Sequence, residues 1–93
     1  MNQIIETIMD QINWRALHWR GFLFIRMSGD TLRINKGRKN LDIRYDAGAD
    51  LYDLSKHTIQ PNLSVKTEQI KGVFWDQLQE ILAEFFGLES DGI

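Results

Sequence analysis

The sequence contains no cysteine, one proline and no long hydrophobic run. Without cysteine, the chain can form no disulfide, thiolate metal site or catalytic thiol. No apolar run approaches the roughly 18 residues that a membrane-spanning helix needs. The N-terminus carries Glu6 and Asp10 in place of the basic start of a signal peptide. These absences predict a cytoplasmic protein that does not engage a membrane.

Motifs for metal or nucleophilic chemistry are also missing. The two histidines, His18 and His57, belong to no His-x₃-His or His-Glu-x-x-His pattern, so we interpret both as structural. No serine-nucleophile motif occurs, and Gly29, Gly37 and Gly48 are too isolated to form a phosphate-cradling loop. The sequence predicts neither an enzyme nor a bound metal or cofactor.

Three aspartates, Asp46, Asp50 and Asp53, are the closest approach to an acidic cluster. Paired carboxylates can catalyse proton transfer or bind a metal, but calcium loops need more ligands in a fixed array. Asp46 and Asp50 flank a glycine-containing segment, where aspartate is favoured for turn formation. We therefore expect turn and solubility roles for them.

The composition is that of a soluble globular domain, with 43% hydrophobic and 26% charged residues. A chain of 93 residues predicts a single domain, 1–93, with one modest core. Charge is uneven: residues 1–45 hold eight basic and four acidic residues, and residues 46–93 hold three and nine. The two halves of the chain carry net charges of +4 and −6. This predicts a surface with one positive and one negative end or, if strands from both halves interleave, a surface on which the two charges are mixed.

Apolar residues at helical spacing occur near both ends of the chain. Residues 2–12 carry one such stripe: Ile4, Ile5, Ile8, Met9 and Ile12. Residues 74–86 carry another: Phe74, Leu78, Ile81, Leu82 and Phe85. Gly87 is placed to end the second helix, with Leu88 folding back onto its last turn. We expect two terminal helices that share one core.

The middle of the chain alternates between apolar and polar residues and predicts strands over 22–25, 31–35, 41–45, 51–59 and 63–70. Residues 13–20 are compatible with an extension of the first helix or with a strand, and residues 67–71 with an early start of the last helix. Short turns between strands require antiparallel pairing. The predicted fold is α+β in two layers, with an N-terminal helix, an antiparallel sheet of four or five strands and a C-terminal helix.

Three segments resemble a group of small, uncharacterised proteins of bacteriophages and mobile elements. They are the Asp-Leu-Tyr strand at 50–52, the Gly-Val-x-x-Asp-Gln-Leu helix start at 72–78 and the helix end at 86–88, with residues 8–12 matching an N-terminal helix motif. The chain departs from the group where Asn13-Trp14-Arg15 replaces Gly-Gly-Asn and where Phe86 replaces a threonine. The resemblance implies a phage origin and a location in the host cytoplasm, and it implies no activity.

Basic residues near the middle of the chain are the best nucleic-acid candidates. They are Arg33, Lys36, Arg38, Lys39 and Arg44. Single-strand readers combine such charge with exposed aromatic rings on a sheet. A sequence pI near 5.6 argues against a dedicated nucleic-acid binder. We keep a small nucleic-acid-binding protein as the alternative hypothesis.

The aromatic content is the stronger lead, with three Trp, five Phe and two Tyr. Either all of these rings lie under the helices, or some remain at the surface. Trp14, Trp19 or Trp75 at the surface would mark a patch for a protein partner or for a homodimer. Our main hypothesis is a non-enzymatic protein-interaction module of phage type, an inhibitor or accessory factor acting on a host protein.

Overall fold

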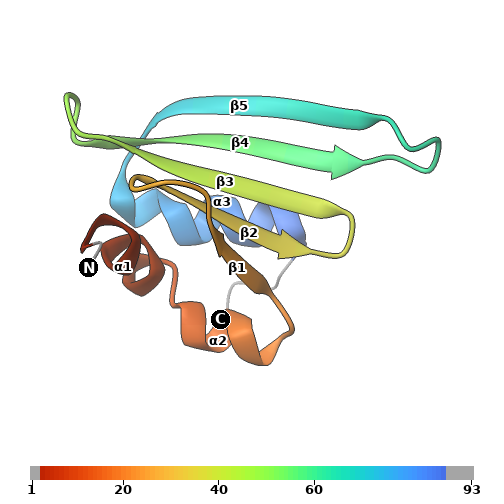
Figure 1. Ribbon diagram of the computed structural model, residues 1–93, viewed down its shortest axis with the longest axis horizontal. Helices are drawn as coiled ribbons and strands as arrows, with labels where there is room; N and C mark the ends of the chain where they lie inside the picture. The colour runs from red at the N-terminus through yellow and green to blue at the C-terminus, as the bar shows by residue number, and fades with distance from the viewer. Residues whose placement is uncertain (1–2, 88–93) are drawn as a thin grey trace.

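A computed structural model describes residues 3–87 and consists of a sheet covered on one side by helices (Figure 1). The helices are α1 (Gln3–Gln11), α2 (Trp14–Trp19) and α3 (Leu78–Phe86), the last preceded by the short 3₁₀ helix η1 (Trp75–Gln77). The strands are β1 (Leu23–Arg26), β2 (Thr31–Lys36), β3 (Lys39–Asp46), β4 (Leu51–Ile59) and β5 (Val65–Val73). The predicted α+β fold is confirmed, with five strands.

The strands form an open sheet in the order β1-β2-β3-β4-β5, and every neighbouring pair is antiparallel. This order follows from the short connections, which allow each strand to pair only with the next. Ile34 pairs with Leu41, and Ile43 pairs with Leu54, so apolar residues of successive strands share one face. The alternation seen in the sequence therefore sets the register.

One hydrophobic cluster lies between that face and the helices. Its fully buried members include Ile5, Ile8 and Ile12 near α1, Leu32, Ile34, Leu41 and Ile43 from the sheet, and Leu78 and Leu82 from α3. The two terminal helices thus share one core, as predicted. The Gln79 Nε2 group also donates to the Gln11 carbonyl oxygen over 2.9 Å, which links α3 directly to the end of α1.

The ambiguous segment 13–20 is a second, separate helix. Asn13 has φ 56° and ψ 59°, a left-handed conformation that ends α1 and redirects the chain into α2. Asparagine is one of the few non-glycine residues that adopts this conformation readily.

The β4–β5 hairpin differs from the sequence prediction. Leu63, expected in the last strand, lies in the turn with φ 69°, and β5 begins at Val65. Lys71 and Gly72 do not end the strand: the register shifts opposite Asp53, and Gly72 adopts φ 72° in that bulge. The bulge lets β5 continue to the buried Val73 and then bend toward η1.

The start of the last helix was also predicted incorrectly. Phe74 is extended and 58% exposed, so it contributes nothing to the buried stripe of α3. Its backbone N–H donates to Gln77 Oε1 over 3.0 Å, which stabilises the turn that precedes α3. Gly87 ends the helix with φ 72°, as expected. The predicted contact of Leu88 lies outside the described residues.

Candidate functional site

A cavity of about 310 Å³ opens between α1, the turn that joins β3 to β4, and η1. The turn between β3 and β4 lies at the opposite end of the sheet from the tip of the β4–β5 hairpin (Figure 1). The lining of the cavity includes Gln3 and Gln11 of α1, Tyr45, Asp50, Tyr52 and Trp75. We call this cavity the aromatic pocket.

The two tyrosines of the aromatic pocket are neighbours across the sheet. Tyr45 of β3 pairs with Tyr52 of β4 on the helix-covered face, and their ring centroids are 5.5 Å apart. Tyr52 is 5% exposed and forms the pocket's inner wall. Trp75 is 61% exposed and stands at its rim. The pocket thus combines a buried tyrosine ring with an exposed tryptophan ring.

Both tyrosine hydroxyls donate to acceptors within the protein. Tyr45 Oη donates to Asp50 Oδ1 over 2.6 Å, and Tyr52 Oη donates to Gln11 Oε1 over 2.7 Å. The hydrogen bond to the Asp50 carboxylate raises the pKa of Tyr45, and burial raises the pKa of Tyr52. Both phenols therefore stay protonated at neutral pH, and each oxygen keeps lone pairs that can accept a hydrogen bond.

Asp50 owes its position to the backbone of the turn. Its φ of 55° is left-handed, a conformation that aspartate tolerates, and it directs the carboxylate back toward Tyr45. Asp46 closes the other side of the turn by accepting the Gly48 N–H over 3.1 Å. No Lys or Arg lines the pocket within residues 3–87, so its local charge is negative.

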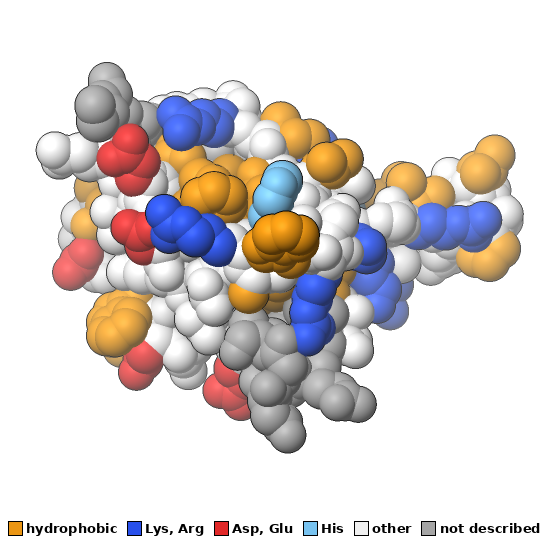
Figure 2. Space-filling model, turned by 90° about the horizontal axis from the view of Figure 1, so that it is seen from below, with side chains coloured by type: hydrophobic (Ala, Val, Ile, Leu, Met, Phe, Trp, Pro, Cys, Tyr) orange, Lys and Arg blue, Asp and Glu red, His pale blue; other side chains and the backbone are white. Residues whose placement is uncertain are grey.

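The three tryptophans predicted to bind a partner lie on two elements. Trp14 of α2 is half-buried, with Phe24 at 6.4 Å and His18 at 6.1 Å between ring centroids. Trp19, at the end of α2, is 89% exposed. Hydrophobic side chains accordingly reach the surface at several separate places on the helix-covered side (Figure 2). Of the three, Trp75 alone belongs to the aromatic pocket.

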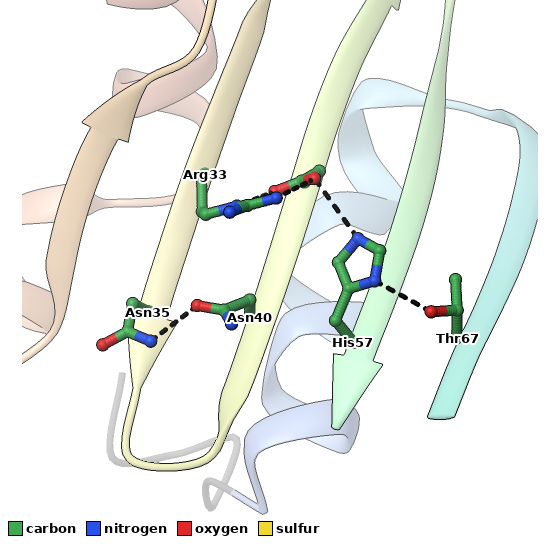
Figure 3. A network of polar contacts seen from close by, with 6 residues as sticks. Arg33, Asn35, Asn40, His57 and Thr67 are labelled. Atoms are coloured by element: carbon green, nitrogen blue, oxygen red, sulfur yellow. Dashed lines mark hydrogen bonds and ion pairs between the residues drawn. The ribbon is translucent and has the colours of Figure 1, made fainter. Parts of the chain in front are cut away.

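The opposite face of the sheet carries a polar network that crosses four strands (Figure 3). Arg33 of β2 binds Asp42 of β3 through two hydrogen bonds of 2.7 and 2.9 Å. His57 Nε2 lies 3.3 Å from Asp42 Oδ2, and His57 Nδ1 lies 3.0 Å from Thr67 Oγ1 of β5. We call this set of four residues the cross-strand network.

The charges of the network stabilise one another. Burial alone would raise the pKa of Asp42, but the hydrogen bonds and charge of Arg33, with a contribution from His57, lower it overall. The same hydrogen bond raises the pKa of Arg33. An aspartate, a histidine and a hydroxyl group joined in a row by hydrogen bonds resemble a catalytic triad. Here the bidentate arginine holds the carboxylate, and each partner comes from the neighbouring strand, so we interpret the network as sheet stabilisation.

Two lysines proposed for nucleic-acid binding face the helices instead. Lys36 Nζ donates to the Arg20 carbonyl oxygen over 2.6 Å, just after α2. Lys39 Nζ donates to the Phe85 carbonyl oxygen over 2.7 Å, in the last turn of α3. Both ammonium groups thus sit at the negative ends of helices and satisfy terminal carbonyl groups.

The three arginines proposed for nucleic-acid binding differ in their surroundings. Arg33 belongs to the cross-strand network, and Arg44 lies 3.6 Å from the Asp30 carboxylate. Arg38 is exposed in the β2–β3 turn, and its side chain makes no hydrogen bond or ion pair with any described residue. Of the five basic candidates, Arg38 is the most available to an external ligand.

No protein-family model matches this chain, and no significant match was found among curated proteins or solved structures. Within residues 3–87, no group of three or more acidic or histidine side chains is arranged to hold a metal ion. None of the helices in that range is long and apolar enough to cross a membrane.

Proposed function

We propose that the chain is a non-enzymatic protein-interaction module of phage type that binds a host protein through the aromatic pocket and its rim. The observation that carries this proposal is the exposure of Trp75 beside a cavity walled by Tyr45 and Tyr52. Tryptophan and tyrosine dominate the energetic centres of protein interfaces, because they bury a large area at a small entropic cost.

The surroundings of the pocket support a binding role. Phe74, which precedes Trp75 in the chain, is 58% exposed, so two consecutive aromatic residues are exposed, and one of them, Trp75, lines the pocket. Neither ring belongs to the hydrophobic core cluster or to the partly buried residues packed against it. Exposed aromatic rings next to a cavity are a typical feature of a surface that a partner covers. The resemblance to phage proteins favours a host protein as that partner.

The nucleic-acid alternative gains less support. Lys36 and Lys39 are bonded to helix carbonyl oxygens, and Arg33 is bonded to Asp42. Using these groups to bind phosphates would break contacts that stabilise the fold. The pocket that holds the exposed Trp75 ring is also lined by the Asp50 carboxylate, which repels a polyanion.

The proposal is tested by affinity capture from bacterial host lysate, followed by binding measurements with the purified captured protein. Trp75→Ala is expected to weaken that binding by about tenfold or more. Trp19→Ala is the matched control, since it removes an even more exposed tryptophan outside the pocket. Equal affinity of wild type and Trp75→Ala would contradict the proposal, as would the absence of any specific partner.

Measuring the mass of the free protein in solution shows whether it forms a dimer, in which a second copy could cover the aromatic pocket. The proposal expects a monomer whose pocket is open to the host protein. A dimer that dissociates on Trp75→Ala substitution would assign the surface to self-association and overturn the proposal.

A further inference from the structure

We infer that the aromatic pocket receives the guanidinium group of an arginine side chain from the protein partner. This inference rests on the proposed function for the source of the arginine. The chemistry of the pocket itself can be tested without any partner.

The pocket offers hydrogen-bond acceptors to a ligand. Tyr45 and Tyr52 both use their hydroxyl protons within the protein, which leaves their oxygen lone pairs for an incoming group. Asp50 is exposed, and its Oδ2 atom has no hydrogen bond from a described residue. A ligand rich in N–H donors and positively charged is complementary to this arrangement.

No described cation lies over the rings of the pocket, whereas three other aromatic rings, Trp14, Phe22 and Phe85, each have at least one. Within residues 3–87, Arg15 lies over Trp14, Lys36 over Phe22, and both Lys39 and Lys56 over Phe85, at 5.0–5.8 Å from the ring centroids. Four of the described cations thus contact other rings, and no described cation lies over Tyr45, Tyr52 or Trp75. Tyr52 is buried against Tyr45, so the exposed Trp75 ring and the partly exposed Tyr45 ring are the ones that an external cation can reach.

An arginine side chain fits this site better than a lysine side chain. The guanidinium group is planar, stacks on aromatic rings and carries five N–H donors, whereas an ammonium group is compact and strongly hydrated. A cavity of about 310 Å³ lies at the lower end of the range for small-ligand sites. It is suited to one side chain inserted from a partner.

The inference is tested by titrating ¹⁵N-labelled protein with N-acetyl-arginine amide and following the indole N–H signals of the three tryptophans. The Trp75 signal is expected to move with saturation, at a dissociation constant on the order of millimolar. The Trp19 signal is an internal control that stays in place. The neutral analogue N-acetyl-citrulline amide and the ammonium analogue N-acetyl-lysine amide are expected to bind at least about fivefold more weakly.

Substitution of Asp50 tests the role of charge. Asp50→Asn keeps the side-chain shape and a left-handed backbone that asparagine tolerates, and it is expected to weaken arginine binding about tenfold. Glu84→Gln removes the same charge from an exposed position on α3 and is expected to leave binding unchanged. If both variants weakened arginine binding equally, the loss would come from the net charge of the protein and not from Asp50 in the pocket, which would overturn the inference.

Other outcomes separate this inference from the proposed function. No movement of the Trp75 signal, or equal binding of the citrulline analogue, overturns the inference even if a protein partner is found. Tighter binding of the lysine analogue overturns the choice of arginine. Saturable, Asp50-dependent arginine binding with no protein partner recovered supports the pocket chemistry and overturns the proposed function.

Discussion

The Nζ atom of Lys39 lies 2.7 Å from the carbonyl oxygen of Phe85, so the end of the β2–β3 hairpin is bonded to the last turn of α3. The same ammonium group lies 5.3 Å from the centroid of the Phe85 ring. A residue that the sequence suggested for phosphate binding therefore holds the C-terminal helix against the sheet.

Substitution of Lys39 by methionine should lower the free energy of unfolding by about 1 kcal/mol, because it leaves a helix carbonyl without its charged donor. Arg38→Met, at the exposed tip of the same turn, is the control and should change stability by less than about 0.5 kcal/mol. Urea unfolding followed by circular dichroism measures both. Equal stability of the two variants would show that the Lys39 contact contributes nothing.

Single-stranded DNA should bind weakly or not at all, because Lys36, Lys39 and Arg33 are held by contacts within the protein. Fluorescence anisotropy with a labelled oligonucleotide at low and high salt measures this. Specific use of the basic residues would appear as binding that falls steeply with salt and is lost in an Arg38→Ala, Lys39→Ala double variant. That result would revive the nucleic-acid hypothesis.

Stability should fall at acid pH partly through Asp42. Burial raises the pKa of Asp42, but Arg33 and His57 together outweigh this effect, so the pKa is lower in the folded chain than the ordinary value of 3.8. The unfolded chain therefore takes up the proton first as pH falls. The contribution of Asp42 is fully present above its unfolded pKa and is lost as pH falls through its folded pKa.

Replacing Asp42 by asparagine, or Arg33 by methionine, should reduce the free energy of unfolding that is lost on acidification by about 0.5–1 kcal/mol. The effect is small because the pair is partly exposed. Unfolding experiments between about pH 5 and pH 2 measure the effect. An unchanged slope in both variants would contradict the linkage between this ion pair and folding.

The junction between α1 and α2 offers a backbone test at Asn13, which has φ 56°. Asn13→Gly should preserve or slightly raise stability, because glycine adopts this conformation without strain. Asn13→Ala should lower the free energy of unfolding by about 1 kcal/mol, because Cβ disfavours the left-handed region. Thermal unfolding compares the two variants, and a more stable alanine variant would be inconsistent with the left-handed junction.

Much of the fold could be predicted from the sequence because its signals are local. The alternation at Leu32 and Ile34 and at Leu41 and Ile43 indicated the buried face of the sheet. The failures involve contacts between distant residues or special backbone angles. Nothing at Leu63 indicates a left-handed turn, and the helical spacing of Phe74 with Leu78 is coincidental, since Phe74 is extended.

The aromatic pocket was harder to predict than the fold. Trp75 was identified as a candidate, whereas Asp50 was assigned only a turn role. The spacing of Tyr45 and Tyr52 around the turn could have indicated a cross-strand pair, which the structure confirms. The hydrogen bond from Tyr52 to Gln11 joins residues 41 positions apart, so no local pattern could have indicated it.

The most direct measurement is the footprint of a purified host partner on the ¹⁵N-labelled chain. Binding is predicted to shift the Trp75 indole signal and the backbone signals of Tyr45, Asp50 and Tyr52. The signals of His57 and Thr67, on the opposite face of the sheet, should stay in place. A footprint centred on His57 and Thr67, with the signals of the aromatic pocket unmoved, would contradict the proposed binding surface.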